Sequence, residues 1–403
     1  MTATFQRQLR LRWMYLGTAV ILLLCLGLIY AWSIFRIPLE REFGWSSTET
    51  SVTFSISMMM FCFGGVASGI LTAHRGVRTT LIACAVCLAS GFGLASQASS
   101  LWEIYVTYGG LCGFGVGLGY NGAISTAVKW FPDRTGLVSG ISLMGFGLGA
   151  MILGMAAAAC IELVGWRTTF LCIAVAFGFV VLAGAFILKA APAAFLQHMS
   201  GHMAAAKQSV EDLQPTAMIC RRNFWLYFAW AAVLSAAGLA IINISAGYAG
   251  EFSGGNLAEA AALAGVVSIA NGVGRILFGQ CFDSQGYRRT MAFVTILVLA
   301  AGLAFIAADM TRQTPVLLLA FVLIGLSYGG VTPTNSAFTA FFFGRTHYAL
   351  NFSVTNLNLI IASYAGPLCA SGKPLTAFVI MIGLAVVAGV LLFCIRRPRQ
   401  QVS

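Results

Sequence analysis

The chain has 403 residues, of which 59% are hydrophobic and only 9% charged, and its mean hydropathy is +0.88. This composition excludes an ordinary water-soluble domain and predicts that most of the chain lies in a lipid bilayer. The net charge of +11 would also suit a nucleic-acid-binding protein. The basic residues, however, sort by side of the predicted membrane spans, so we expect the bilayer and no nucleic acid as partner.

Twelve apolar segments, each long enough to cross a bilayer, follow one another along the chain. A spanning helix needs about 20 apolar residues, and these segments are too uniformly apolar for the alternating strands of a membrane barrel. We therefore predict an all-α membrane protein with twelve transmembrane helices. The first six segments are 13–35, 51–73, 79–97, 102–128, 136–160 and 166–189, and the second six are 224–248, 258–281, 290–308, 315–341, 348–370 and 374–395.

The longest polar interruption separates the sixth and seventh segments. It predicts an amino-terminal six-helix bundle at 1–189, a cytoplasmic linker at 190–223 and a carboxy-terminal six-helix bundle at 224–403. With the amino terminus placed in the cytoplasm, most Lys and Arg residues fall on the cytoplasmic side, and Arg275 falls inside a span. The opposite side receives Arg36, Arg41, Arg167, Arg312 and Lys373. This asymmetry predicts that both termini are cytoplasmic.

An internal repeat supports the division into two halves. Gly69 and Gly76 after the second span are matched by Gly279 and Gly286 after the eighth, a shift of 210 residues. The Arg134-Thr135 step recurs as Arg345-Thr346, a shift of 211 residues. Repeats of this kind build carriers that alternate between two conformations and bind substrate near the middle of the membrane.

The segment GQCFDSQGYRR at 279–289 resembles the signature of the major facilitator superfamily, and the first-half copy, GILTAHRGVR, resembles it less because Ala73 stands where the pattern has Asp. The resemblance implies two pseudo-symmetric six-helix bundles, with Asp283 making a charge contact at a helix end that favours one conformation. The candidate conformational residues are Gly69, Gly76, Arg78, Asp133, Arg134, Gly279, Asp283, Gly286, Arg288 and Arg289.

Three further segments narrow the resemblance. GLIYAWSIFRIPLEREFGWSS, KWFPDRTGLVSGISLMGFGLG and NGVGRILFGQCFD are similar to the oxalate/formate antiporter family and related bacterial monocarboxylate carriers. The resemblance implies a secondary transporter of small carboxylates in a bacterial inner membrane, coupled to a proton or a counter-anion. We expect a monomer without metal or cofactor. We do not expect an enzyme, because no paired carboxylates, histidine cluster or nucleophile motif stands at membrane depth.

Arg275 is the most informative single residue. An arginine keeps its proton and is costly in a bilayer unless it meets water or an anion, and all 12 acidic residues fall at predicted loops or helix ends. A substrate carboxylate is the simplest partner, since it accepts two parallel charge-assisted hydrogen bonds from arginine. The alternative is that Arg275 reaches the cytoplasmic end of its helix or binds backbone carbonyls.

Asn271 stands four residues before Arg275 and shares its helix face, so both can contact one ligand; helix packing is the alternative role. Proton-coupled monocarboxylate transporters resemble this segment but commonly carry Asp at this position, and an Asn cannot titrate. The other candidate substrate-binding residues offer a hydroxyl or an amide, with packing again the alternative: Tyr30, Tyr120, Asn121 and Tyr328.

The number of fixed cations favours a monoanion. The oxalate exchanger of this family has a Lys in its eleventh helix, and the resemblance places Leu359 there. A dianion would remain uncompensated in a low dielectric, so we expect lactate, pyruvate or formate. The alternatives are a multidrug or organic-cation efflux pump on the same fold, although no buried carboxylate is evident, and an anion sensor that does not transport.

Glycines spaced four apart, such as Gly136 and Gly140, clear one face of a helix for close backbone approach. Such faces can slide during a conformational change, although static packing is the more common use of small residues.

Overall fold

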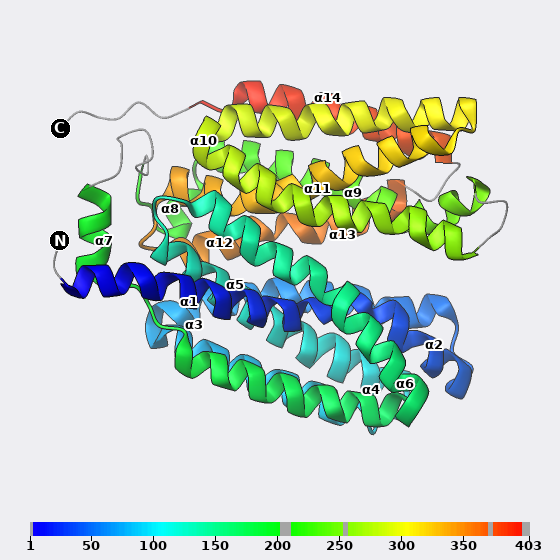
Figure 1. Cartoon of the computed structure of the whole chain (residues 1–403), viewed down its shortest axis with the longest axis horizontal. Helices are drawn as coiled ribbons and strands as arrows, with labels where there is room; N and C mark the ends of the chain where they lie inside the picture. Colours follow the sequence, from blue (N-terminus) through cyan, green and yellow to red (C-terminus); the bar gives the residue numbers. More distant parts are fainter. Residues whose placement is uncertain (1–2, 202–210, 253–256, 370–373, 397–403) are drawn as a thin grey trace. The chain divides into compact units, whose positions relative to one another are not determined.

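The computed structural model describes residues 3–201, 211–252, 257–369 and 374–396, and these are helical or in short turns, with no strand among them (Figure 1). Lys373, assigned above to the non-cytoplasmic side, lies outside the described residues. The chain forms two compact units. Unit 1 comprises Met1–Asp133, Ser142–Ala205 and His347–Val354, and unit 2 comprises Arg134–Ile141, Ala206–Thr346 and Thr355–Ser403.

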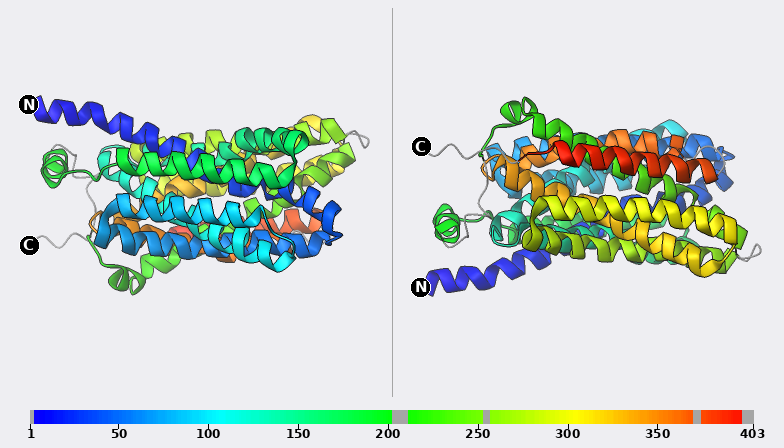
Figure 2. Two further views of the ribbon diagram at one scale, coloured as in Figure 1. Left: turned by 90° about the horizontal axis from the view of Figure 1, so that it is seen from below. Right: turned by 90° about the horizontal axis from the view of Figure 1, so that it is seen from above.

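Long helices make up most of unit 1, and they run side by side with similar axes (Figure 2). Two short segments depart from α-helical geometry: the 3₁₀ turns of η1 inside the first membrane helix and the π-helical η2 inside the fourth. The elements are α1 (Ala3–Leu26), η1 (Gly27–Ala31), α2 (Trp32–Phe43), α3 (Ser47–Ala95), α4 (Leu101–Ile104), η2 (Tyr105–Cys112), α5 (Gly113–Trp130), α6 (Thr135–Ile187) and α7 (Ala193–Gly201).

Unit 2 has the same kind of organisation, and one of its membrane helices is broken at Leu357. Residues 135–141 of α6 belong to this unit, while residues 348–354 of α12 belong to unit 1. The elements are α8 (Pro215–Ile219), α9 (Arg222–Phe252), α10 (Leu257–Thr311), α11 (Thr314–Phe343), α12 (Tyr348–Asn356), α13 (Asn358–Cys369) and α14 (Pro374–Cys394).

Three long helices change direction at a single glycine. Gly76 in α3, Gly165 in α6 and Gly286 in α10 have φ of 81°, 79° and 79° with extended ψ, a conformation that is open essentially to glycine alone. Each of these helices is therefore two antiparallel arms, as Figure 1 shows for α10. Two of the three positions, Gly76 and Gly286, are the repeat glycines predicted from the sequence.

Within the described residues, seven helices are long and apolar enough to cross a membrane. Three of them are the two-armed helices, which contain two predicted spans each. The spans predicted at 102–128 and 348–370 correspond to α4–η2–α5 and α12–α13, where a π turn and the break at Leu357 divide the helix. Over the residues that the structure describes, all twelve predicted spans are thus found as helical segments, and the all-α membrane architecture is confirmed.

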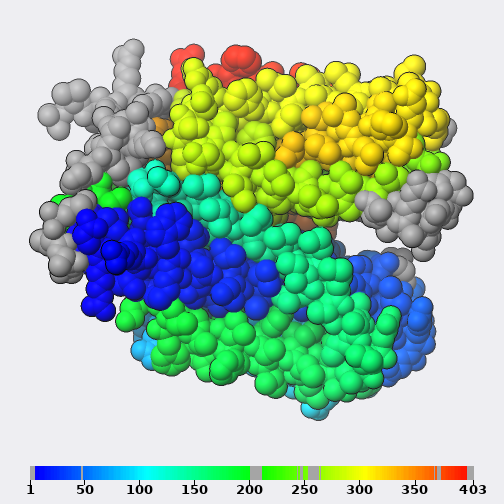
Figure 3. Space-filling view, in the orientation of Figure 1, coloured from blue at the N-terminus to red at the C-terminus, as the bar shows by residue number. Residues whose placement is uncertain are grey.

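Glycines set close helix crossings in unit 1. A Cβ on Gly27 of η1 would lie 2.0 Å from the carbonyl oxygen of Phe146 in α6, and a Cβ on Gly149 would lie 2.2 Å from that of Leu24. Figure 3 shows α1, in dark blue, packed along the green α6. Because a side chain at either position would separate the helices, glycine here fixes a backbone-to-backbone contact.

Candidate functional site

Arg275 and Asn271 lie on one face of α10, as their spacing predicts. The Arg275 Nε donates a hydrogen bond to the Asn271 Oδ1 at 3.2 Å. Arg275 is only 5% exposed, whereas Asn271 is partly exposed. The amide therefore orients a buried, permanently charged guanidinium within a membrane-spanning helix.

Tyr328 of α11 lies near this pair. Its phenol is buried, and the next residue, Gly329, packs against the backbone of Asn271 and Arg275. Gly238 of α9 makes room for the ring, since a Cβ there would lie 2.4 Å from the Tyr328 Cδ2. The structure thus brings together three of the predicted substrate-binding residues, and their substrate role stays a prediction.

Two glycines hold the backbone of this site, and the sequence analysis did not assign either of them to it. A Cβ on Gly329 of α11 would lie 2.2 Å from the Asn271 carbonyl oxygen and 3.1 Å from the Arg275 nitrogen. A Cβ on Gly140 of α6 would lie 2.2 Å from the Arg275 carbonyl oxygen. The Gly136–Gly140 spacing predicted close approach, but only the fold shows that the neighbour is Arg275.

The predicted tyrosines of unit 1 share one aromatic neighbour. The ring of Phe146 in α6 lies 5.3 Å from the ring of Tyr30 and 4.9 Å from that of Tyr120, measured between centroids. Tyr30 lies in the 3₁₀ segment η1 and is partly exposed, whereas Tyr120 in α5 is buried. Their contact with substrate stays a prediction.

Asn121 of α5 joins three helices of unit 1. Its Nδ2 donates to the carbonyl oxygens of Gly65 in α3 at 3.0 Å and Ala349 in α12 at 2.9 Å. The Asn121 side chain is 1% exposed. These bonds match the helix-packing role that was the alternative for this residue type, and its substrate role stays a prediction.

The second copy of the repeat motif contacts the start of α6. Both carboxylate oxygens of Asp283 accept backbone hydrogen bonds, from Gly136 N at 2.9 Å and Leu137 N at 2.8 Å. A Cβ on Gly279 would lie 2.1 Å from the Gly136 carbonyl oxygen. Asp283 therefore satisfies two amides that a helix start leaves without intrahelical partners, and its charge stabilises the positive end of the helix dipole.

The remaining candidate conformational residues lie before or after the glycine turns of α3 and α10, or just before α6. Gly69 of α3 contacts α12, where a Cβ would lie 2.7 Å from the Leu350 Cα. Asp133 forms an ion pair with Arg12, whose Nη1 donates a hydrogen bond to the Asp133 Oδ1 at 3.1 Å. The four remaining arginines are exposed. Arg78 lies over the ring of Phe186, and Arg134 lies just before α6. Arg288 and Arg289 follow the turn at Gly286, and the Arg289 Nη1 donates a hydrogen bond to Gln285.

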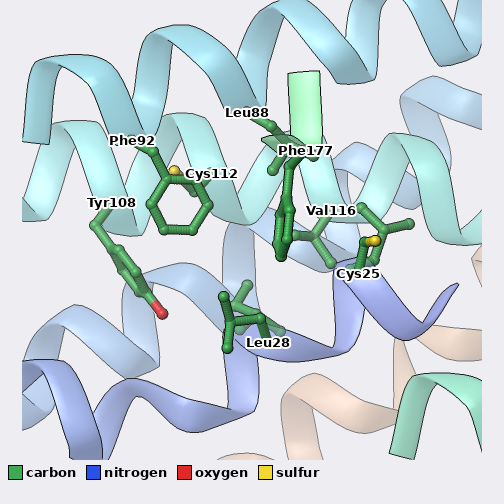
Figure 4. A pocket seen from close by; sticks show the side chains of 10 residues that line it. Cys25, Leu28, Leu88, Phe92, Tyr108, Cys112, Val116 and Phe177 are labelled. Atoms are coloured by element: carbon green, nitrogen blue, oxygen red, sulfur yellow. The ribbon is translucent and has the colours of Figure 1, made fainter. Parts of the chain in front are cut away.

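A small apolar pocket inside unit 1 was not predicted (Figure 4). It is lined by Cys25, Leu26, Leu28, Ile29, Leu88, Phe92, Tyr108, Cys112, Val116 and Phe177. The Tyr108 hydroxyl lies in it, fully buried and without a hydrogen-bond partner among the described residues. None of the predicted site residues lines this pocket.

Long apolar helices, a repeated hairpin motif and a buried arginine define a multi-pass membrane carrier. The chain belongs to the Major Facilitator Superfamily, whose family model matches residues 17–367. Carriers of this family and fold are not enzymes.

Known relatives span most of the chain at low identity. The chain is 25% identical to an uncharacterized MFS-type transporter, YhjX, of Escherichia coli, with 88% of this chain and 86% of the relative covered. It is 27% identical to the oxalate:formate antiporter of Oxalobacter formigenes, with 85% of this chain and 80% of the antiporter covered. It is 26% identical to monocarboxylate transporter 3 of Rattus norvegicus, with 79% of this chain and 65% of that transporter covered.

The fold is also found among solved structures. The proton:xylose symporter XylE bound to 6-bromo-6-deoxy-D-glucose matches with a TM-score of 0.64 and 14% identity, covering 94% of this chain and 96% of the symporter. At that identity the likeness concerns the fold alone. The predicted superfamily is confirmed.

Proposed function

We propose that this chain transports small monocarboxylate anions, such as lactate, pyruvate or formate, by alternating access. The observation that supports this most is the buried guanidinium of Arg275 in α10, with its Nε bonded to Asn271. A charge at such a position is costly in a bilayer. A substrate carboxylate can accept two charge-assisted hydrogen bonds from an arginine. Two relatives bear names that refer to small carboxylates.

A single negative charge suits this site better than two. Leu359, at the position where the resembling oxalate exchanger has a Lys, is 9% exposed in α13. An apolar side chain there offers no second cation, so the second charge of a dicarboxylate would be desolvated without compensation.

Two modes of coupling fit an Asn at position 271, whose amide does not titrate. One is exchange of anions, and the other is transport of a proton together with the substrate. We further propose a monomer in a bacterial inner membrane with both termini cytoplasmic. Its two six-helix halves would be 1–189 and 224–403, joined by the linker 190–223.

Counterflow in proteoliposomes tests the proposal. Vesicles preloaded with unlabelled lactate are offered labelled lactate, pyruvate, formate or oxalate at several pH values. We expect uptake of the monoanions and little uptake of oxalate; a need for internal substrate indicates exchange, and a need for a proton gradient indicates symport. Uptake of organic cations without uptake of carboxylates would instead support an efflux pump, and binding without uptake would support a sensor.

A further inference from the structure

The turn before α12 is held by a carboxylate from the segment before α8. The Asp212 Oδ1 accepts a hydrogen bond from the backbone nitrogen of Thr346 at 3.3 Å, and its Oδ2 accepts one from the Thr346 hydroxyl. The next residue, Leu213, donates its backbone N–H to the Phe343 carbonyl oxygen at 3.0 Å. Residues 212 and 213 are thus bonded to both ends of the turn at 343–346.

Gly344 is required for this contact. Its φ is +85°, and a Cβ on it would lie 2.2 Å from the Asp212 Oδ1 and 2.6 Å from the Asp212 Cα. Any other residue would be strained and would also displace the carboxylate. The turn is therefore shaped to admit Asp212.

The start of α6 offers a direct comparison, because it is the repeat mate of the start of α12. Thr135 matches Thr346, and Gly279 in α10 matches Gly69 in α3. Both glycines meet the helix start that their repeat position predicts: Gly279 meets Gly136, and Gly69 meets Leu350. The two crossings join corresponding helices, but they are not identical: Gly136 matches His347, so the contact of Gly69 lies about one turn further along its partner helix.

The copies differ in the source of their carboxylate. At α6 it comes from Asp283 of the two-armed helix α10, which bonds two backbone amides. The matching position in α3 is Ala73, whose methyl group accepts no hydrogen bond. Asp212 brings a carboxylate to the backbone just before α12 instead.

We propose that Asp212 is a gating residue that replaces, from the linker, the carboxylate that position 73 lacks. Its carboxylate holds the turn at 343–346, from which the chain continues into α12, and a negative charge just before a helix start is favourable. Residues 212 and 213 are then part of the device that sets the conformational equilibrium. This inference rests on the chain working as an alternating-access carrier, but not on which substrate it carries.

Hydrogen–deuterium exchange on the purified full-length protein in detergent tests the contact without any substrate. In Asp212→Ala, amides of 348–354 should exchange about 3- to 10-fold faster, as expected for loss of a helix-end carboxylate. Asp212→Asn keeps the size of the side chain and removes the charge, so it should show a smaller change in the same direction. Glu211→Ala removes only the neighbouring exposed ion pair with Arg221 and should leave these amides unchanged.

The decisive variant restores the carboxylate from the other element. Adding Ala73→Asp to Asp212→Ala should return the exchange of 348–354 to within about twofold of the wild type, and should return the counterflow rate as well. The same substitution added to Asp283→Ala should not slow the exchange of 136–141, because it acts at the other repeat copy.

Either of two results in the single variants would overturn the proposal: unchanged exchange at 348–354 in Asp212→Ala, or an equal effect of Glu211→Ala. A third is failure of Ala73→Asp to restore the exchange, which would mean that Asp212 only anchors the linker. Failure of the carboxylate proposal is a separate outcome. The wild type would then carry no monocarboxylate while the exchange pattern and its rescue remained as described.

Discussion

Glycines of two helices touch the backbone around Arg275, and they decide where its guanidinium lies. Gly329 meets Asn271 and the Arg275 nitrogen, and Gly140 meets the Arg275 carbonyl oxygen. The charged side chain is thereby attached to a tightly packed crossing, and the Asn271 hydrogen bond fixes its orientation. A small shift of either neighbouring helix would move the charge.

Replacing Arg275 with lysine is expected to lower monocarboxylate counterflow about 10- to 100-fold, because one charge-assisted hydrogen bond and the planar fork are lost. The measurement is initial uptake per inserted protein, quantified on blots of the proteoliposomes. Arg222→Lys is the matched control, since Arg222 is exposed at the start of α9. Near wild-type uptake by Arg275→Lys would remove the main support for a carboxylate substrate.

Gly329→Ala should separate α10 from α11 beside Arg275. The added methyl group cannot occupy a position 2.2 Å from the Asn271 carbonyl oxygen, so we expect a loss of about 1–3 kcal/mol of stability together with slower uptake. The apparent melting temperature in detergent measures the first effect. Gly383→Ala in α14 has nothing within 4 Å of its Cβ and should not lower the melting temperature.

At the scale of single elements, hydropathy located the membrane helices but not their true lengths. The first predicted span, 13–35, lies within helical residues 3–43, because hydropathy reports the bilayer core while the polar ends of α1 and α2 continue the helix outside it. The segments η1 and η2 were not predicted. Their geometry depends on packing against other helices, such as the Gly27 contact with Phe146.

Gly286→Ala tests the one-residue turn of α10. Alanine at φ 79° and ψ 174° is strained, with an expected cost of about 1–3 kcal/mol, even though there is open space around the position. Thermal unfolding in detergent should show a clear decrease in apparent melting temperature. Gly389→Ala, also in open space but inside the helix α14, should raise the temperature or leave it unchanged; an equal decrease in both would contradict the role of the turn.

At the scale of the whole molecule, the repeat predicted more than hydropathy did. The 210-residue shift identified Gly76 and Gly286, and both adopt the same glycine-only conformation. Of the candidate site, the Arg275–Asn271 contact followed from helical spacing. The roles of Gly238 and Asp212 did not, because each depends on which distant segment lies opposite it, and one sequence carries no signal of that pairing.

Reporter fusions test the predicted topology of the chain. Alkaline phosphatase, which is active only outside the cytoplasm, should be inactive when fused after Ser403 and active when the chain is truncated after Ser99, between the third and fourth spans. Green fluorescent protein fused at the same two positions should give the opposite pattern. Activity of the phosphatase at Ser403 would place the carboxy terminus outside and reverse the assignment of the basic residues.

The reversal of α10 at Gly286 has a mechanical consequence. Since one residue joins the two arms, there is no slack between them, and the arm that carries Arg275 cannot tilt without pulling the arm at 287–311 along with it. The two arms should therefore move together at their shared end. A displacement of the arm that carries Arg275 would therefore reach the second arm through Gly286 alone.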